Sequence, residues 1–199
     1  MEKLDIFDEY MNFVGTEDID TVHSLGHWHK TVHCWLYDTD GNIYFQIRKS
    51  SQKLYTTASG HAQSGETIKQ AFAREVREEL GVNIQLDDAE LVEINAWRMD
   101  KIKNGKPFID RAFAHVYLSQ ITPNTAFHIG LDEVSGIVKI KATDCLNLLM
   151  HNTASIPAIK ITNTLENISL TEDDFLTQDG ELAILKYGKI IQRIIKKSN

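Results

Sequence analysis

Short runs of alternating apolar and polar positions occur along much of the chain, a pattern typical of β-strands separated by turns. Two such runs, residues 31–37 and 42–48, flank the segment DTDGN, in which Asp-Gly tolerates the positive φ of a hairpin turn. Further turns are predicted at DEYMN, inside a short N-terminal hairpin, and at NGKP. The predicted strands cover residues 4–7, 12–14, 31–37, 42–48, 90–99, 108–118 and 136–141.

A helical spacing of apolar residues appears in three longer segments. The first runs from about residue 66 to 80 and ends at Gly81, which suits the left-handed conformation that often follows a helix. The other two cover residues 142–150 and 182–197, and the second is amphipathic with a basic end that suits the helix dipole. Shorter helical turns are predicted at the capping residues Thr16, Thr171 and Asp174.

The order of these elements predicts an α/β or α+β sandwich with a mixed sheet. The stretch 152–170 has weak periodicity and is expected to be loop. We therefore expect one main domain over residues 1–150. A C-terminal helical extension over residues 151–199 is expected to pack on the same domain.

Composition narrows the class of protein. The 199 residues include 42% hydrophobic and 25% charged positions, as in soluble globular proteins, and no stretch approaches the ~18 apolar residues of a membrane span. A net charge of −7 argues against nucleic acid or an anionic membrane as the main partner. Cys34 and Cys145 form no CxxC pair and the N-terminal MEKLDIFDEY has no apolar signal core, so we expect a cytoplasmic protein with reduced thiols.

Three glutamates of the first long helix carry the candidate chemistry. At about 100° per residue, Glu75, Glu78 and Glu79 fall within an arc of about 60° beside the apolar stripe of the helix. Like charges at this spacing repel one another, so a positive partner is expected, and a hard divalent cation with oxygen ligands satisfies it. The alternative is a solvated acidic helix face, which is common.

The residues around these glutamates favour the cation. Gly60, Glu66, Arg74-Glu75-Val76, Glu78-Glu79 and Gly81-Val82 have the spacing of the Nudix box, so residues 60–82 resemble that motif at all nine specified positions. The resemblance implies a Nudix-type α/β/α sandwich with Mg²⁺ or Mn²⁺ bound by the loop–helix–loop. It implies metal ligation by the three glutamates and by the carbonyl of Ser59, and a structural ion pair between Glu66 and Arg74.

The chemistry that this resemblance implies is the attack of water on a phosphorus atom of a diphosphate linked to a nucleoside or another organic group. Glu75 and Glu133 are alternative general bases, and Glu133 is as well explained as a solvated loop residue. Glu78 and Glu79 would act through the metal. The expected partner is therefore a small diphosphate, and a homodimer is an option by analogy. Candidate phosphate ligands are Arg48, His61, Arg98 and Arg111.

The segment upstream, from HWHKTVHCW to SGHAQSGE, resembles isopentenyl-diphosphate isomerase, a Nudix-fold enzyme that does not hydrolyse its substrate. That family has a catalytic cysteine where this chain has Ser59, and a serine hydroxyl does not ionise near neutral pH. His61 and His29 match two of its metal-binding histidines and His23 lies near the place of a third, but GKPFIDRAF offers no match for its glutamate ligands. The alternative for His29 and His61 is a hydrogen-bonded pocket or structural role. Isomerase activity, a second metal at these histidines and a non-catalytic ligand sensor remain as alternatives to the hydrolase.

Overall fold

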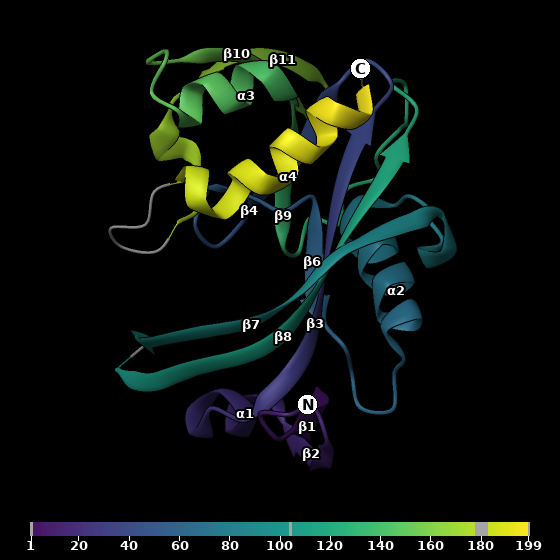
Figure 1. Cartoon of the computed structure of the whole chain (residues 1–199), viewed down its shortest axis with the longest axis vertical. Coiled ribbons are helices and arrows are strands. Elements are labelled where there is room, and N and C mark those ends of the chain that lie inside the picture. Colours follow the sequence, from purple (N-terminus) through teal and green to yellow (C-terminus); the bar gives the residue numbers. More distant parts are fainter. Residues whose placement is uncertain (1, 104, 178–182, 199) are drawn as a thin grey trace.

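The computed structural model describes residues 2–103, 105–177 and 183–198. Within these residues eleven strands form one sheet, in the order β11-β10-β9-β4-β3-β1-β2, with β5 on β4, β6 and β8 on β3, and β7 on β8 (Figure 1). β3 and β8 run parallel while the other pairs are antiparallel, so the sheet is mixed as predicted. The strands are β1 (Lys3–Phe7), β2 (Phe13–Asp18), β3 (Trp28–Asp38), β4 (Asn42–Arg48), β5 (Leu54–Tyr55), β6 (Ala58–His61), β7 (Ala89–Lys103), β8 (Lys106–Ile121), β9 (Val134–Lys141), β10 (Ile156–Ile161) and β11 (Leu165–Leu170).

The helices agree closely with the predicted segments. They are α1 (Ile19–Leu25), α2 (Ile68–Leu80), α3 (Ala142–Leu149) and α4 (Ala183–Ser198), with short 3₁₀ turns η1 (Leu86–Asp88) and η2 (Glu172–Asp174). α2 begins two residues later than expected because Thr67 and Gln70 form a capping box, and Gly81 ends it at φ +66°. None of the helices in the described part of the chain is long and apolar enough to cross a membrane.

One predicted cap is wrong. Thr16 lies in β2, and the N-cap of α1 is Asp18, which makes no side-chain capping bond. The Thr16 hydroxyl instead donates to Asp5 across the β1–β2 hairpin at 3.1 Å. The antiparallel pairing of β1 with β2 extends β2 through the residues expected to start the helix. Thr16 is therefore part of a strand and cannot cap α1.

β3 divides the molecule into layers because its side chains alternate between the two faces of the sheet. Val32, Cys34 and Leu36 pack against Phe72 and Val76 of α2 on one face. On the other face, Trp35 and Tyr37 of β3 join a core to which α3 and α4 contribute, including the buried Tyr187 and Ile191 of α4. These two cores give the three-layer arrangement that the sandwich prediction requires.

The stretch 152–170 is not loop. It forms the β10–β11 hairpin, and β10 pairs with β9, so this part of the C-terminal extension lengthens the sheet and the extension is not purely helical. Most residues of β11 are exposed, which removes the apolar alternation that marks a half-buried strand. Leu182, the expected first residue of the last helix, lies outside the described residues. The division into domains at residue 150 stays a prediction.

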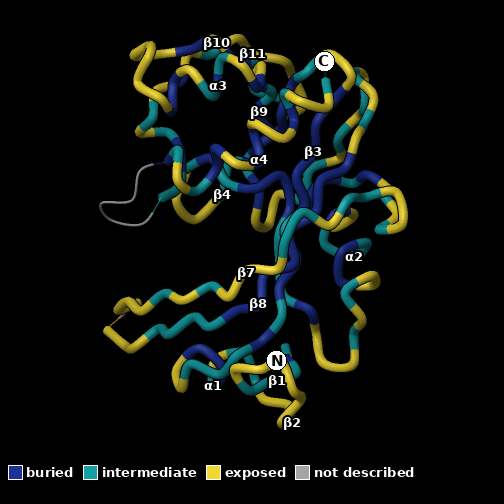
Figure 2. The backbone as a smooth tube through the Cα atoms, in the orientation of Figure 1, coloured by how far each residue is buried: buried dark blue, intermediate teal, exposed yellow. Residues whose placement is uncertain are grey.

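The outer halves of β7 and β8 form an arm that projects from the body (Figures 1 and 2). Both strands are longer than predicted, and the outer residues of β7 alternate between half-buried and exposed before becoming fully exposed. Asn104 of the predicted NGKP turn lies outside the described residues, while Gly105 has φ +74°. The base of this arm brings residues of β8 to α1 and to the start of β3.

Candidate active site

The loop between β6 and α2 is shaped by contacts at both ends. A Cβ atom on Gly60 would lie 2.1 Å from the carboxyl carbon of Glu75, so only glycine leaves room for that carboxylate. Further along, the backbone N–H of Ser64 donates to Lys3 of β1 at 2.8 Å, and the Asp5 carboxylate accepts from the Ser64 hydroxyl at 2.8 Å. The N-terminal hairpin thereby holds the loop in place.

Glu66 and Arg74 form a two-pronged salt bridge across this loop. The Nε and Nη2 atoms of Arg74 lie 2.8 and 2.9 Å from the two Glu66 oxygens, and Nη2 also donates to the His61 carbonyl at 2.8 Å. Burial works to raise the pKa of Glu66, but the bonds from Arg74 and from the Gln63 N–H outweigh it and lower that pKa. The pair therefore joins helix, loop and strand through one guanidinium.

The three box glutamates differ in environment. Glu79 is only 5% exposed and accepts from the Ser59 N–H at 2.8 Å and from the Gln46 amide at 3.3 Å. Burial raises the pKa of Glu79 to about 8 and that of Glu75 to about 7, and neighbouring carboxylates add to both shifts. Glu78 is half exposed, and the Nη1 atom of Arg74 lies 2.7 Å from Glu75 and 3.1 Å from Glu78.

This donor set fits a divalent cation. Burial and repulsion between neighbouring carboxylates raise the pKa of Glu75 and Glu79 even though Arg74 contacts Glu75, so a further cation would stabilise the two ionised carboxylates. The donors are oxygens, as Mg²⁺ and Mn²⁺ prefer. Glu75, Glu78 and Glu79, with the Ser59 carbonyl, are the residues that would hold the ion. Because Arg74 also contacts Glu75 and Glu78, these two carboxylates must exchange the guanidinium for the cation.

A second loop closes over the end of α2. Gly130 donates its N–H to the Glu79 carbonyl at 3.0 Å, and a Cβ atom there would lie 2.1 Å from the Glu78 carbonyl oxygen. Glu133 follows in the same loop, and its charge contributes to the raised pKa of both Glu75 and Glu79. Glu133, a candidate general base, is therefore near the carboxylate cluster formed by Glu75, Glu78 and Glu79, although its side chain is exposed.

A fifth carboxylate near the cluster was missed by sequence reasoning. Burial is the main cause that raises the pKa of Glu2, and the charges of Glu133, Glu66 and Glu78 add to it against Arg74. The Glu2 carbonyl accepts from the Ile19 N–H at 3.0 Å, which fixes the backbone beside the box loop. More than fifty residues separate Glu2 from the box, so spacing within the motif carries no signal for it.

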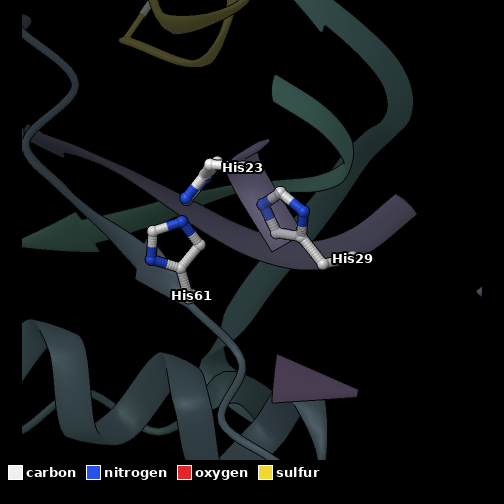
Figure 3. Close-up of side chains that lie close together, drawn as sticks. All are labelled: His23, His29 and His61. Atoms are coloured by element: carbon white, nitrogen blue, oxygen red, sulfur yellow. The ribbon is translucent and has the colours of Figure 1, made fainter. Parts of the chain in front are cut away.

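Three histidines meet on the other side of the box loop. His23 of α1, His29 of β3 and His61 of β6 place one ligand atom each within 4.8 Å of the others (Figure 3). Their ring centroids are 5.1–5.3 Å apart. Burial lowers the pKa of all three, that of His61 to about 3, so each ring is neutral at pH 7 and can offer a nitrogen lone pair.

Asp110 of β8 supplies the carboxylate that the sequence did not reveal. Its Oδ1 lies 3.6 Å from His29 Nε2, and both atoms are buried without a hydrogen-bond partner among the described residues. His29 Nδ1 lies 3.2 Å from the His27 carbonyl, which assigns the ring proton to Nδ1 and leaves a lone pair on Nε2. Two buried acceptors therefore face each other, and burial raises the pKa of Asp110. A cation bound by His29 Nε2 and Asp110 Oδ1 would satisfy both atoms.

The three candidate phosphate-binding arginines occupy separate places. Arg48 of β4 lies over the Tyr55 ring at 5.1 Å, and its charge contributes to the low pKa of His61, which puts it beside the box. Arg98 lies over the Trp28 ring at 5.0 Å. Arg111 faces Arg98 across β7 and β8, and its guanidinium is engaged by Asp100 and the Asp110 carbonyl. Of the three, Arg48 is the one whose charge acts on a residue of the box, His61.

Comparison with known proteins identifies the family of the chain. Residues 27–153 match the family model described as NUDIX domain. An uncharacterised Nudix hydrolase of Clostridium acetobutylicum is 35% identical over 157 residues, covering 74% of each chain. The chain therefore belongs to the Nudix hydrolase family.

Two further similarities are more limited. An isopentenyl-diphosphate Delta-isomerase of Salmonella heidelberg is 34% identical over 89 residues, which cover 42% of this chain and 49% of that enzyme. The crystal structure of DR0079 from Deinococcus radiodurans superposes with a TM-score of 0.54 at 22% identity, over 75% of this chain and 89% of that one. The second similarity concerns the fold alone, and it agrees with the mixed α/β sandwich.

Proposed function

We propose that the protein is a Mg²⁺- or Mn²⁺-dependent hydrolase of a diphosphate bond in a small organic diphosphate. The observation that carries the proposal is the placing of three box carboxylates together on α2, of which Glu75 and Glu79 are largely shielded from solvent and have raised pKa values, so that a cation would stabilise their ionised forms. A bound divalent cation would neutralise phosphate oxygens and lower the pKa of an attacking water.

The chain's own groups then have distinct tasks. The Ser59 N–H and the Gln46 amide orient Glu79, while Arg74 holds the loop through Glu66 and the His61 carbonyl. Glu75 and Glu133 are the alternative proton acceptors for the attacking water, since both lie by the cluster. Arg48, the basic side chain beside the box, would bind a substrate phosphate.

We also propose that His23, His29, His61 and Asp110 hold a second divalent metal. The observation that favours it is the pair of orphaned acceptors, His29 Nε2 and Asp110 Oδ1. Three imidazole nitrogens and one carboxylate suit Zn²⁺ or Mn²⁺ better than Mg²⁺. Isomerase chemistry is not favoured by this site, because Ser59 still stands where a thiol is required.

The hydrolase proposal is tested by measuring phosphate release from a panel of nucleoside and isoprenoid diphosphates during Mg²⁺ and Mn²⁺ titrations. Glu79→Gln should abolish metal-dependent turnover, while Glu166→Gln, on the exposed face of β11, should leave it unchanged. No turnover on any panel member by correctly folded wild-type protein, or equal turnover by wild-type protein and Glu79→Gln, would contradict the proposal.

The second metal is tested by elemental analysis of purified protein after dialysis against Zn²⁺ or Mn²⁺. Wild-type protein should retain the ion and His29→Asn should lose it. His151→Asn is the matched control, because His151 is an exposed histidine with φ +59°, a conformation that asparagine tolerates. Equal metal content in His29→Asn and wild-type protein would exclude this site.

A further inference from the structure

Exposed apolar side chains are concentrated in the N-terminal unit, residues 2–25, which comprises β1, β2 and α1. Among the described residues, twelve large hydrophobic side chains are exposed, and five of these belong to this short unit: Tyr10, Met11, Phe13, Val14 and Leu25. A sixth, Ile102, is 71% exposed on the neighbouring arm of β7 and β8. Single exposed apolar residues are ordinary, but such a concentration indicates a surface that contacts another molecule.

The tip of the β1–β2 hairpin presents Tyr10 in a fixed conformation. The Asp8 carboxylate accepts from the backbone N–H groups of Tyr10 and Asn12 and from the Asn12 amide, each at 2.9 Å. Between them Met11 has φ +69°, which costs free energy in a residue other than glycine. Tyr10 is 77% exposed on this ordered turn. A tyrosine on an ordered turn suits an interface anchor, because little further ordering is needed when it binds.

The N-terminal unit and the arm carry opposite charge. Residues 2–25 include seven acidic residues and one lysine, a formal net charge of −6. The arm, residues 98–111, includes five basic and two acidic residues, a net charge of +3. Lys3 pairs with Asp18 and Arg111 with Asp100, and among the described residues no ion pair joins the unit to the arm. The two complementary charges are therefore not paired with each other inside one chain.

The unit and the arm adjoin at one end of the molecule, where both have exposed outer sides (Figure 2). His23 of α1 stacks on Phe108 of β8 with ring centroids 4.5 Å apart, and a Cβ atom on Gly26, at the end of α1, would lie 2.5 Å from Ile109. An acidic and a basic region side by side match the same surface of a second copy related by a two-fold axis, because each acidic region then faces a basic one.

We propose that the N-terminal unit and the arm form the interface of a two-fold symmetric homodimer, in which the arm of each copy contacts the N-terminal unit of the other. Tyr10, Phe13 and Ile102 would supply apolar contact area, and the surrounding charges would fix the orientation of the two copies. This inference goes beyond the proposed hydrolysis, because dimer formation requires neither metal nor turnover.

Sedimentation velocity of the full chain, in a chelator that prevents metal-mediated association, tests the dimer directly. A concentration series at low salt should show a transition from one to two copies. Raising NaCl from about 0.05 M to about 0.5 M should raise the dimer dissociation constant about fivefold or more, because salt screens the charges at the rim. A monomer at every concentration would overturn the inference. So would assemblies that grow beyond two copies, since a two-fold interface is closed.

Two variants locate the interface. Tyr10→Ala, which removes the anchor, should raise the dimer dissociation constant about tenfold, and Lys106→Glu on the exposed arm should raise it about as much. Leu165→Ala and Lys196→Glu are the matched controls, because both residues are exposed but lie on β11 and α4, and they should have no effect. Circular dichroism checks that each variant is folded. Equal dissociation constants for wild-type protein, Tyr10→Ala and Lys106→Glu would overturn the inference.

Cross-linking between chains tests the proposed orientation. A carbodiimide, which couples carboxylates to lysine amines, would be added to a mixture of isotope-labelled and unlabelled chains. Mass spectrometry should find peptides in which residues 8–20 of one chain are joined to residues 101–106 of a chain with the other label. A dimer that gives such links only within chains of one label, or only between other regions, would overturn the proposed interface.

Discussion

The carboxylate cluster of α2 and the histidine cluster beside it are the two candidate metal-binding groups, but they arise in different ways. Glu75, Glu78 and Glu79 come from two turns of one helix, so their spacing in the sequence already places them together. The three histidines come from α1, β3 and β6, and only the folded sheet assembles them (Figure 3). The first cluster is a local feature of the sequence and the second is a product of the fold.

Burial acts on the two clusters in opposite directions. It raises the pKa of Glu75 and Glu79 and lowers that of the three histidines, because in each case it disfavours the charged form. The donors of the two clusters differ as well, with oxygens on α2 and mainly nitrogens in the histidine cluster, so they should select different ions.

The largest expected effect separates catalysis from folding. Glu79→Gln should lower kcat by about 10³-fold or more, since it removes a carboxylate from the proposed metal site. In metal-free protein it should leave the melting temperature unchanged or raise it, because burial disfavours the charged Glu79 carboxylate and glutamine carries no charge. Parallel kinetics and thermal melts check both halves. A large fall in the metal-free melting temperature would show that Glu79 serves the fold instead.

The next effect concerns ion selectivity. Zn²⁺ at 100 times its dissociation constant should raise the free energy of unfolding by about 2.7 kcal/mol through the histidine cluster. Glu79→Gln should retain this stabilisation and His29→Asn should lose it. Chemical denaturation with and without Zn²⁺ measures the difference. Loss of the Zn²⁺ effect in Glu79→Gln would mean that the two clusters bind one shared ion.

The alkaline side of the stability profile should report the carboxylates. The pKa of Glu79 is about 8 when folded against 4.5 for the isolated side chain, so the folded state keeps a proton that the unfolded chain releases. Its stabilising contribution is full below about pH 4.5 and is lost as the pH rises through about 8, by on the order of 5 kcal/mol. Denaturation of metal-free protein between pH 5 and 9 should show this loss. Glu79→Gln should reduce it.

The acidic side of the stability profile should depend on the histidines, and there stability should fall as the pH falls. The pKa of His61 is about 3 when folded against 6.5 for the free side chain, so the unfolded chain takes up the proton first as the pH falls. Stability should be full above about pH 6.5 and should decrease toward pH 3. His61→Asn should flatten this limb and leave the alkaline one intact. A single variant that flattens both limbs would disprove the separation of the clusters.

The smallest effect distinguishes the arginines. Arg48→Ala should raise KM about tenfold, because its guanidinium lies beside the box, whereas Arg98→Ala should change KM by less than about twofold. Steady-state kinetics on the best substrate of the panel gives both values. Equal effects would mean that the arm formed by β7 and β8 reaches the substrate.

How much the sequence predicted depended on how local each feature was. The Asp-Gly hairpin, the α2 helix and its end at Gly81 depend on neighbouring residues, and these features are present as expected. The β10–β11 hairpin was missed because β11 is mostly exposed, which removes the alternation that reveals a strand. The arginines could not be sorted either, because their positions relative to the box depend on how the strands that carry them pair in the sheet.

The same reasoning explains the two carboxylates that were not found. Asp110 reaches His29 only through the parallel pairing of β3 and β8, in which His29 stands opposite Ala112. Glu2 reaches the cluster because β1 lies along the box loop, where Leu4 pairs with Gln63. Neither contact has a signature in a single sequence, since both join segments more than fifty residues apart.

Arg74 has a consequence for how an ion would enter the site. Its guanidinium contacts Glu75 and Glu78 while remaining bonded to Glu66 and the His61 carbonyl. The protein thus carries a built-in counter-ion that partly neutralises Glu75 and Glu78. An arriving metal competes with this internal cation for two carboxylates, yet the other two bonds can persist and keep the loop in shape. Metal binding would therefore replace the Arg74 guanidinium at Glu75 and Glu78 by the metal ion, while the loop keeps its conformation.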